Sequence, residues 1–150
     1  MLSVGKLFAV AAVLALVVGF VRWPQPQTGF YTITIKNRAY GLGSEYWAFP
    51  IAAIFAVLAA AYYWLPILIS LDLGHSVSLL HFWLSAISAF AFLLLLPLWN
   101  GFTRLTNSMA EERGAVAILA IMVISTLLFL LAQVIFVVAC VWSAFYGRKV

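Results

Sequence analysis

The sequence predicts an all-α membrane protein, with four transmembrane helices in a single domain and a short extramembrane strand or hairpin between the first two helices. Three observations carry this prediction. Of the 150 residues 67% are hydrophobic and 8% are charged, and the mean hydropathy is +1.15, which a water-soluble domain of this size does not show. Apolar runs long enough to cross a bilayer recur four times along the chain. The six tryptophans fall near the ends of these runs, as expected for side chains that prefer the bilayer interfaces.

The first span is predicted over residues 4–22. Its apolar core follows a lysine and ends at Arg22, and no small-x-small cleavage site comes after it, which favours a retained span over a cleaved signal peptide. Ala11, Ala15 and Gly19 are spaced by four residues and therefore share one helix face. Such a stripe of small side chains lets another helix approach closely, although an alanine-rich span without a particular partner explains it equally well.

The second span is predicted over residues 46–70 and follows the longest polar segment of the chain. Within that segment Tyr31–Ile35 alternates β-branched residues as a strand does, which predicts a strand or hairpin outside the bilayer. Pro50 lies in the first turn of the span, where a missing N–H costs little. Pro66 lies near the far end and is expected to bend or stop the helix.

The third and fourth spans are predicted over residues 77–99 and 111–146. Asn100-Gly101 is a turn signal that is expected to end the third. Ser108 and Glu111 have the spacing of a capping box, in which each side chain satisfies a free backbone N–H at a helix start. The fourth apolar run exceeds the ~30 Å hydrocarbon core at ~1.5 Å per residue, so it must tilt or project.

Two sets of residues are candidates for contact with partner subunits. Small residues on the second span repeat every four positions, and polar residues on the fourth repeat every seven. Gln133 is the most polar group at mid-membrane, where its amide needs a hydrogen-bond partner. That partner is either another subunit or another helix of the same chain. The two sets are Ala52, Ala56 and Ala60, and Thr126, Gln133 and Cys140.

Charge and cysteine content exclude several classes of function. The formal net charge of +4 comes from residues scattered over loops and termini, so no basic surface for nucleic acid is expected. Cys140 is the single cysteine, which excludes an internal disulfide and any Cys-x-x-Cys metal site. The acidic residues Glu45 and Asp72 fall at span ends. With no ionisable group at the bilayer centre, a proton pump or ion-coupled carrier is disfavoured.

His75 and His81 are the only histidines. Six residues apart, they point in different directions on a helix, so a heme held by both within one chain is not expected. We interpret His75 as a turn residue at the membrane edge and His81 as a hydrogen-bonding residue at a helix start. The alternative is a heme-binding electron carrier that pairs these histidines across a dimer. A small four-helix channel or transporter using Gln133 is a third hypothesis.

Three segments resemble the last helices of the catalytic subunit (subunit I) of heme-copper oxygen reductases, the cytochrome c and quinol oxidases. Ile54–Val57 with the aromatic cluster Tyr62–Pro66 is similar to the tenth helix, and Leu80–Leu84 to the start of the eleventh. Gln133–Phe136, followed by Val141–Ser143, resembles the twelfth. The segments occur in the family's order and spacing.

The departures from the family concern its metal ligands. In this register the family's heme-binding His-x-His pair falls on Ser44 and Tyr46. A serine does not ligate heme iron usefully, and a tyrosine does so only as a phenolate. The family's outer His-Asp metal site falls on Lys36-Asn37, and a single arginine, Arg104, lies within a few residues of where the family keeps a propionate-binding pair. The resemblance therefore implies a degenerate homologue with no catalytic residues, no bound metal and no cofactor.

These expectations define a non-catalytic accessory or structural subunit of a prokaryotic respiratory membrane complex, a heme-copper terminal oxidase of the electron-transport chain. Its partners are then other subunits of the complex and membrane lipid, with lipid or quinone in the space that heme fills in the relatives. The chain is expected in the inner or plasma membrane as a multi-pass protein. The resemblance implies cytoplasmic termini, whereas the distribution of lysine and arginine leans the other way.

Overall fold

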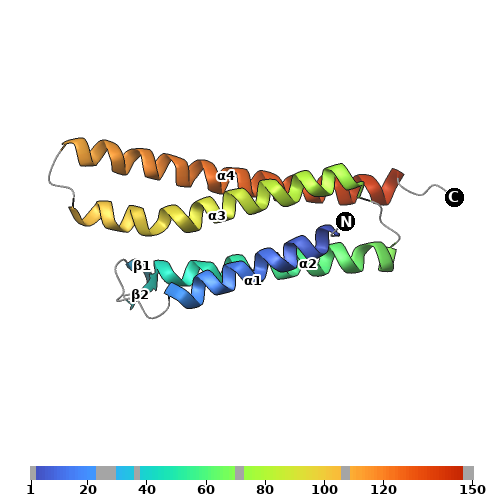
Figure 1. Cartoon of the computed structure of the whole chain (residues 1–150), viewed down its shortest axis with the longest axis horizontal. Coiled ribbons are helices and arrows are strands. Elements are labelled where there is room, and N and C mark those ends of the chain that lie inside the picture. Colours follow the sequence, from blue (N-terminus) through green and yellow to red (C-terminus); the bar gives the residue numbers. More distant parts are fainter. Residues whose placement is uncertain (1–2, 23–29, 36–37, 70–72, 106–108, 147–150) are drawn as a thin grey trace.

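The computed structural model describes residues 3–22, 30–35, 38–69, 73–105 and 109–146, and their side chains within 3–21, 46–68, 73–98 and 113–145. The elements are α1 (Val4–Arg22), β1 (Phe30–Ile35), β2 (Arg38–Gly43), the 3-10 turn η1 (Ser44–Trp47), α2 (Ala48–Ile69), α3 (His75–Leu105) and α4 (Met109–Tyr146). The four α-helices form two antiparallel pairs, α1 with α2 and α3 with α4 (Figure 1). α1 begins and α4 ends at one end of the bundle, and the two strands lie toward the other (Figure 1).

Each of the four helices is long and apolar enough to cross a membrane. The qualifying segments are Val4–Val21, Ala48–Leu68, His75–Leu98 and Arg113–Phe145. Large apolar side chains are exposed on all four helices, among them Phe20, Leu68, Leu94 and Phe145. A surface of this kind is stable in hydrocarbon and not in water. The prediction of four membrane-spanning helices is therefore confirmed, and the fold is that of a multi-pass membrane protein.

α1 and α2 pack closely because small residues line the contact. Ala11 and Ala15 are buried, and a Cβ added to Gly19 would lie 3.1 Å from the Cζ atom of Phe49. A Cβ on Gly5 would lie 3.3 Å from the carbonyl oxygen of Ala59 at the other end of the pair. The small-residue stripe on the first helix thus faces another helix of the same chain.

In the sequence, the strands β1 and β2 come between α1 and α2, and they pair with each other. They are antiparallel, in a register that runs from Ile35 opposite Arg38 to Phe30 opposite Gly43. The β-branched alternation of Tyr31–Ile35 falls inside β1. β2 leads through η1 directly into α2.

The structure corrects the predicted bounds of the third helix. α3 begins at His75 and continues through Asn100-Gly101 to Leu105, so the prediction that this dipeptide ends the helix was wrong. A glycine inside a helix costs only about 1 kcal/mol relative to alanine. A single turn signal of this size therefore does not end a long, otherwise apolar helix. α4 begins at Met109, two residues earlier than predicted; the cap residue Ser108 lies outside the described residues.

Candidate functional site: a buried polar stripe in the helix bundle

α3 buries a stripe of polar side chains along the face that it turns to the other helices. Ser78, His81, Ser85 and Ser88 are all buried, and their spacing of three, four and three residues places them on one helix face. His81 and Ser85 have no exposed surface (0%), so they belong to the interior of the bundle. A buried polar group in a membrane-spanning helix requires hydrogen-bond partners, and most partners here come from neighbouring helices.

His81 lies at the point where all four helices meet. Its Nδ1 atom is 3.0 Å from the hydroxyl oxygen of Tyr62 on α2, and the hydroxyl of Ser78 also interacts with Tyr62. Its Nε2 atom is buried without a hydrogen-bond partner. His81 was predicted as a hydrogen-bonding residue near a helix start; the structure gives it a hydrogen bond to a different helix, with its side chain fully buried in the bundle.

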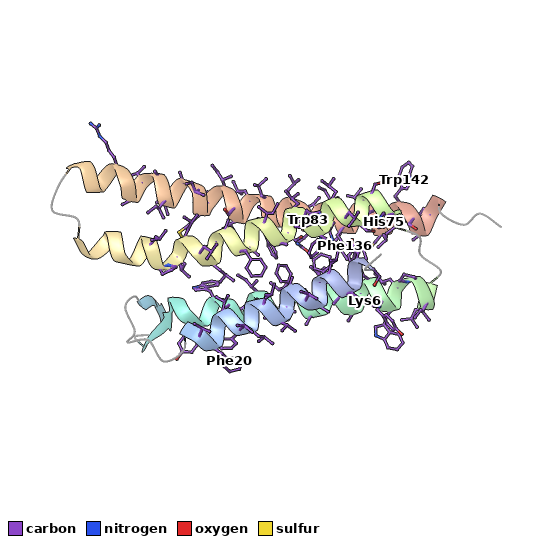
Figure 2. The ribbon with its side chains drawn as sticks, in the orientation of Figure 1. Lys6, Phe20, His75, Trp83, Phe136 and Trp142 are labelled. Carbon is purple, nitrogen blue, oxygen red and sulfur yellow. The ribbon has the colours of Figure 1, made fainter. Side chains whose placement is uncertain are left out.

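Aromatic rings enclose the His81 imidazole. Phe136 of α4 stacks on it with ring centroids 5.0 Å apart and an interplanar angle of 18°, and Phe8 of α1 approaches to 5.2 Å. Tyr62 stacks on it at 5.8 Å. Figure 2 shows the Phe136 side chain between the two helix pairs. Three rings therefore lie against the imidazole, which bonds the Tyr62 hydroxyl through Nδ1.

Gln133 extends the polar contacts from α3 to α4. Its Nε2 atom donates to Ser85 Oγ at 3.2 Å and to the carbonyl oxygen of Phe129 at 3.3 Å. The amide that was expected at mid-membrane is thus bonded within the chain, as one of the two interpretations of the sequence proposed. Other hydroxyls turn back to their own helices: Ser88 Oγ lies 2.6 Å from the Leu84 carbonyl, and Thr126 Oγ1 lies 2.9 Å from that of Met122.

The remaining polar candidates lie apart from this stripe. His75 is the first residue of α3 and is exposed, at the same end of the bundle as Trp142 (Figure 2). Ser44 and Tyr46 both lie in η1, at the entrance to α2. Arg104 lies in the last turn of α3, and its side chain is outside the described residues. Lys36-Asn37 is also outside them.

The small and polar candidates for partner contact differ in exposure. Ala52 is buried against the rest of the bundle, whereas Ala56 and Ala60 are exposed. Thr126 is exposed and Cys140 is half-buried. Of the two expected stripes, Ala52 is buried within this chain and Gln133 bonds a second helix of it. The exposed members remain candidates for contact with another subunit.

Two cavities lie on the side of the bundle where α2 faces α4. The first has a volume of about 170 Å³ and is bordered by Trp47 of η1, Ile54 of α2, Phe92 of α3 and Phe129 of α4, among others. The second, of about 420 Å³, lies between Val57 and neighbouring residues of α2 and Gln133 with its neighbours on α4. Neither cavity is fully enclosed, and neither is bordered by His81.

Of the polar stripe on α3, only His81 was a candidate from the sequence; the three serines and the partner Tyr62 were not. The signal was present, because Ser78, His81, Ser85 and Ser88 keep helical spacing in an otherwise apolar run. Tyr62 could not be distinguished from Tyr63 by pattern, and only the fold places the first inside and the second outside.

The chemistry of these groups is that of hydrogen bonding and ring stacking. Within the described parts of the chain, no three His, Cys, Asp or Glu residues come close enough together to hold a metal ion.

Comparison of the chain with models of known families, with characterised proteins and with solved structures finds no match. The class defined by the fold is thus a four-helix multi-pass membrane protein with a buried polar stripe.

Proposed function

We propose that this protein is a non-catalytic accessory subunit of a prokaryotic respiratory membrane complex, a heme-copper terminal oxidase. One observation carries the proposal. The three segments that resemble the oxidase subunit meet at a single point: Tyr62 from the first bonds His81 from the second, and Phe136 from the third stacks on the same imidazole. Segments that pack as one unit are what a retained scaffold requires.

The polar groups of this unit hold helices together and offer little to a substrate. Gln133 is bonded to Ser85, and Tyr62 to His81, so each pair links two helices. The outer faces of the bundle are apolar and carry the exposed alanines Ala56 and Ala60, which suit close packing against another membrane helix. We place the protein in the cell membrane with cytoplasmic termini, and the β1–β2 hairpin outside the bilayer.

The proposal is tested by isolating the chain with its neighbours. Purification in a mild detergent through a tag on the C-terminus is expected to recover heme-bearing subunits, visible as a Soret band and identifiable by mass spectrometry. An unrelated four-helix membrane protein with the same tag, expressed in the same cells, is the control. Recovery of this chain alone, as a monodisperse species without heme, would contradict the proposal.

The geometry disfavours the alternative of a heme-binding electron carrier. An axial ligand needs an imidazole nitrogen with open space in front of it. At His81 the Nδ1 atom is taken by Tyr62, and the Nε2 atom is buried in the bundle with no open space in front of it. His75 is exposed at the first residue of α3. A Soret band from the isolated chain, lost on His75→Ala, would restore this alternative.

The polar stripe is the observation that favours a second candidate, a small channel or transporter. A conducting path needs polar groups that water can reach, and here Ser85 and Ser88 are buried with their hydrogen bonds made inside the bundle. We therefore rank it second. Solute flux through vesicles that contain the pure chain, abolished by Gln133→Leu, would favour this candidate over the accessory subunit.

A further inference from the structure

His81 is an ionisable side chain inside a membrane-spanning helix, where such residues are rare and usually serve a function. It lies within the span His75–Leu98, has no exposed surface (0%), and its Nδ1 atom is 3.0 Å from the hydroxyl oxygen of Tyr62. Elsewhere in the bundle, Gln133 and Ser85 join two helices with groups that do not titrate. A phenol beside an imidazole places an acid and a base in the interior, which the joining of helices does not require.

The Tyr62 oxygen has two polar neighbours, the Ser78 hydroxyl and the Nδ1 atom of His81. A neutral imidazole accepts a hydrogen bond at one nitrogen and donates at the other. One arrangement uses each proton once: Ser78 donates to the phenol oxygen, the phenol donates to Nδ1, and the imidazole carries its own proton on Nε2. In this arrangement the lone pair of a base faces the proton of Tyr62.

We propose that Tyr62 and His81 form a reversible one-electron redox site, in which Tyr62 is oxidised and His81 takes up its proton. The oxidant is a high-potential metal centre of another molecule, held at the membrane surface, which accepts one electron. In the same step the Tyr62 O–H bond breaks and an N–H bond forms at Nδ1. The products are a neutral tyrosyl radical, an imidazolium and a metal centre reduced by one electron. Return of the electron reverses both transfers.

The surroundings of His81 suit the charge that this step leaves behind. Oxidation of a phenol without a base nearby would leave a radical cation in hydrocarbon, which is costly because water is absent. With His81 as the base, the positive charge moves to an imidazolium. The ring of Phe136 stacks on this imidazole at 5.0 Å, between the two helix pairs, and Phe8 lies at 5.2 Å (Figure 2). Aromatic rings attract a cation, and they do so more strongly where water is excluded.

Tyr62 is also placed for electron exchange with the membrane surface. It lies about 9 Å from the Leu68 end of the α2 span, at ~1.5 Å per residue. The neighbouring Tyr63 is exposed, and in the described part of the chain it makes no hydrogen bond to a histidine. Oxidation of Tyr63 therefore has no base within the protein to receive the proton, which makes this residue the matched control.

The first test oxidises the full-length chain in detergent micelles with photogenerated tris(bipyridine)ruthenium(III), a one-electron oxidant. Wild type and Tyr63→Phe are expected to show a persistent tyrosyl radical by electron paramagnetic resonance, and Tyr62→Phe is expected to lose it. His81→Asn offers an amide oxygen that accepts a hydrogen bond but cannot take up the proton, so it should lose the radical as well. Circular dichroism checks that each variant folds. A persistent radical in folded Tyr62→Phe or His81→Asn would overturn the inference.

A second measurement uses the unaltered protein, in case the variants do not fold. The chain is produced with isotope-labelled histidine, and the radical is searched for coupling to a histidine nitrogen. This coupling is expected, because His81 Nδ1 lies within hydrogen-bond distance of the Tyr62 oxygen. No persistent radical, or one without the coupling, would overturn the inference. Both measurements use this chain alone, so neither outcome depends on the proposed function or on which subunits co-purify.

Discussion

At the residue scale, the Tyr62–His81 pair is the clearest link between the two halves of the bundle. A hydroxyl on α2 and an imidazole on α3 meet at 3.0 Å in surroundings made mostly of aromatic rings. Such a bond contributes modestly when formed. Leaving one partner alone in the interior costs more, because a buried polar group then has no substitute for water.

Tyr62→Phe tests this pair. The substitution keeps the ring and removes the hydroxyl, so both nitrogens of His81 are left without a partner. We expect the free energy of unfolding in micelles to fall by about 1–3 kcal/mol. Tyr63→Phe is the control, since that side chain is exposed and its change should have almost no effect. The double variant Tyr62→Phe with His81→Phe should be more stable than Tyr62→Phe alone; a further loss would contradict the argument.

Gln133→Leu separates the two interpretations of the polar face on α4. The amide bonds Ser85 and its own helix, so its loss should lower the stability of the isolated chain by about 0.6–1.7 kcal/mol, the range measured for such bonds in membranes. The yield of co-purified subunits should not change, because the amide is engaged within the chain. Thr126→Val, which removes a hydroxyl bonded to its own helix, is the matched control. Stable protein with lost partners would instead place Gln133 at a subunit interface.

At the scale of elements, the close contact between α1 and α2 depends on small residues. A Cβ added to Gly19 would lie only 3.1 Å from the Cζ atom of Phe49. Ala15, one turn earlier on the same helix, is fully buried. Phe20 and Phe49 meet edge to face beside this point, with centroids 5.6 Å apart. A larger side chain must push the helices apart or displace these rings.

Gly19→Leu is therefore expected to destabilise the protein by about 1–3 kcal/mol, the usual cost of overpacking. Ala9→Leu adds similar bulk to the exposed face of the same helix and should be neutral. Thermal unfolding in detergent, followed by circular dichroism, measures both. Gly19→Leu with an unchanged melting temperature would show that α1 does not need this close approach.

The elements themselves could largely be predicted from the sequence, because four long apolar runs leave few alternatives. Their exact ends could not, since a turn signal such as Asn100-Gly101 costs a helix only about 1 kcal/mol and lies inside α3. It was harder still to predict which face of each helix points into the bundle. α2 is apolar on all sides, so nothing in its pattern says that Phe55 points inward and Val57 outward. On α3 the serine spacing carried that information, and His81 shares its face.

At the scale of the whole molecule, two helix pairs are joined by a few large rings. Phe8 of α1 is fully buried and contacts rings of both pairs. It lies 5.9 Å from Phe55 and 5.5 Å from Tyr62 on α2, and 5.1 Å from Phe82 on α3. The loosely packed α2–α4 side contributes less, since cavities lie there. The association of the pairs should thus depend on Phe8 more than on any single polar bond.

Phe8→Ala tests this arrangement. Truncation of a buried phenylalanine typically costs about 3–5 kcal/mol, more than the Tyr62→Phe and Gln133→Leu changes are expected to cost. Phe20→Ala is the control, because that ring is exposed near the other end of α1 and should cost little (Figure 2). Unfolding in micelles gives the free energies, and spin labels on exposed residues of α2 and α4 give the distance between the pairs. A broadened distance distribution in Phe8→Ala alone is expected; an unchanged one would mean that the pairs are held by contacts away from this ring.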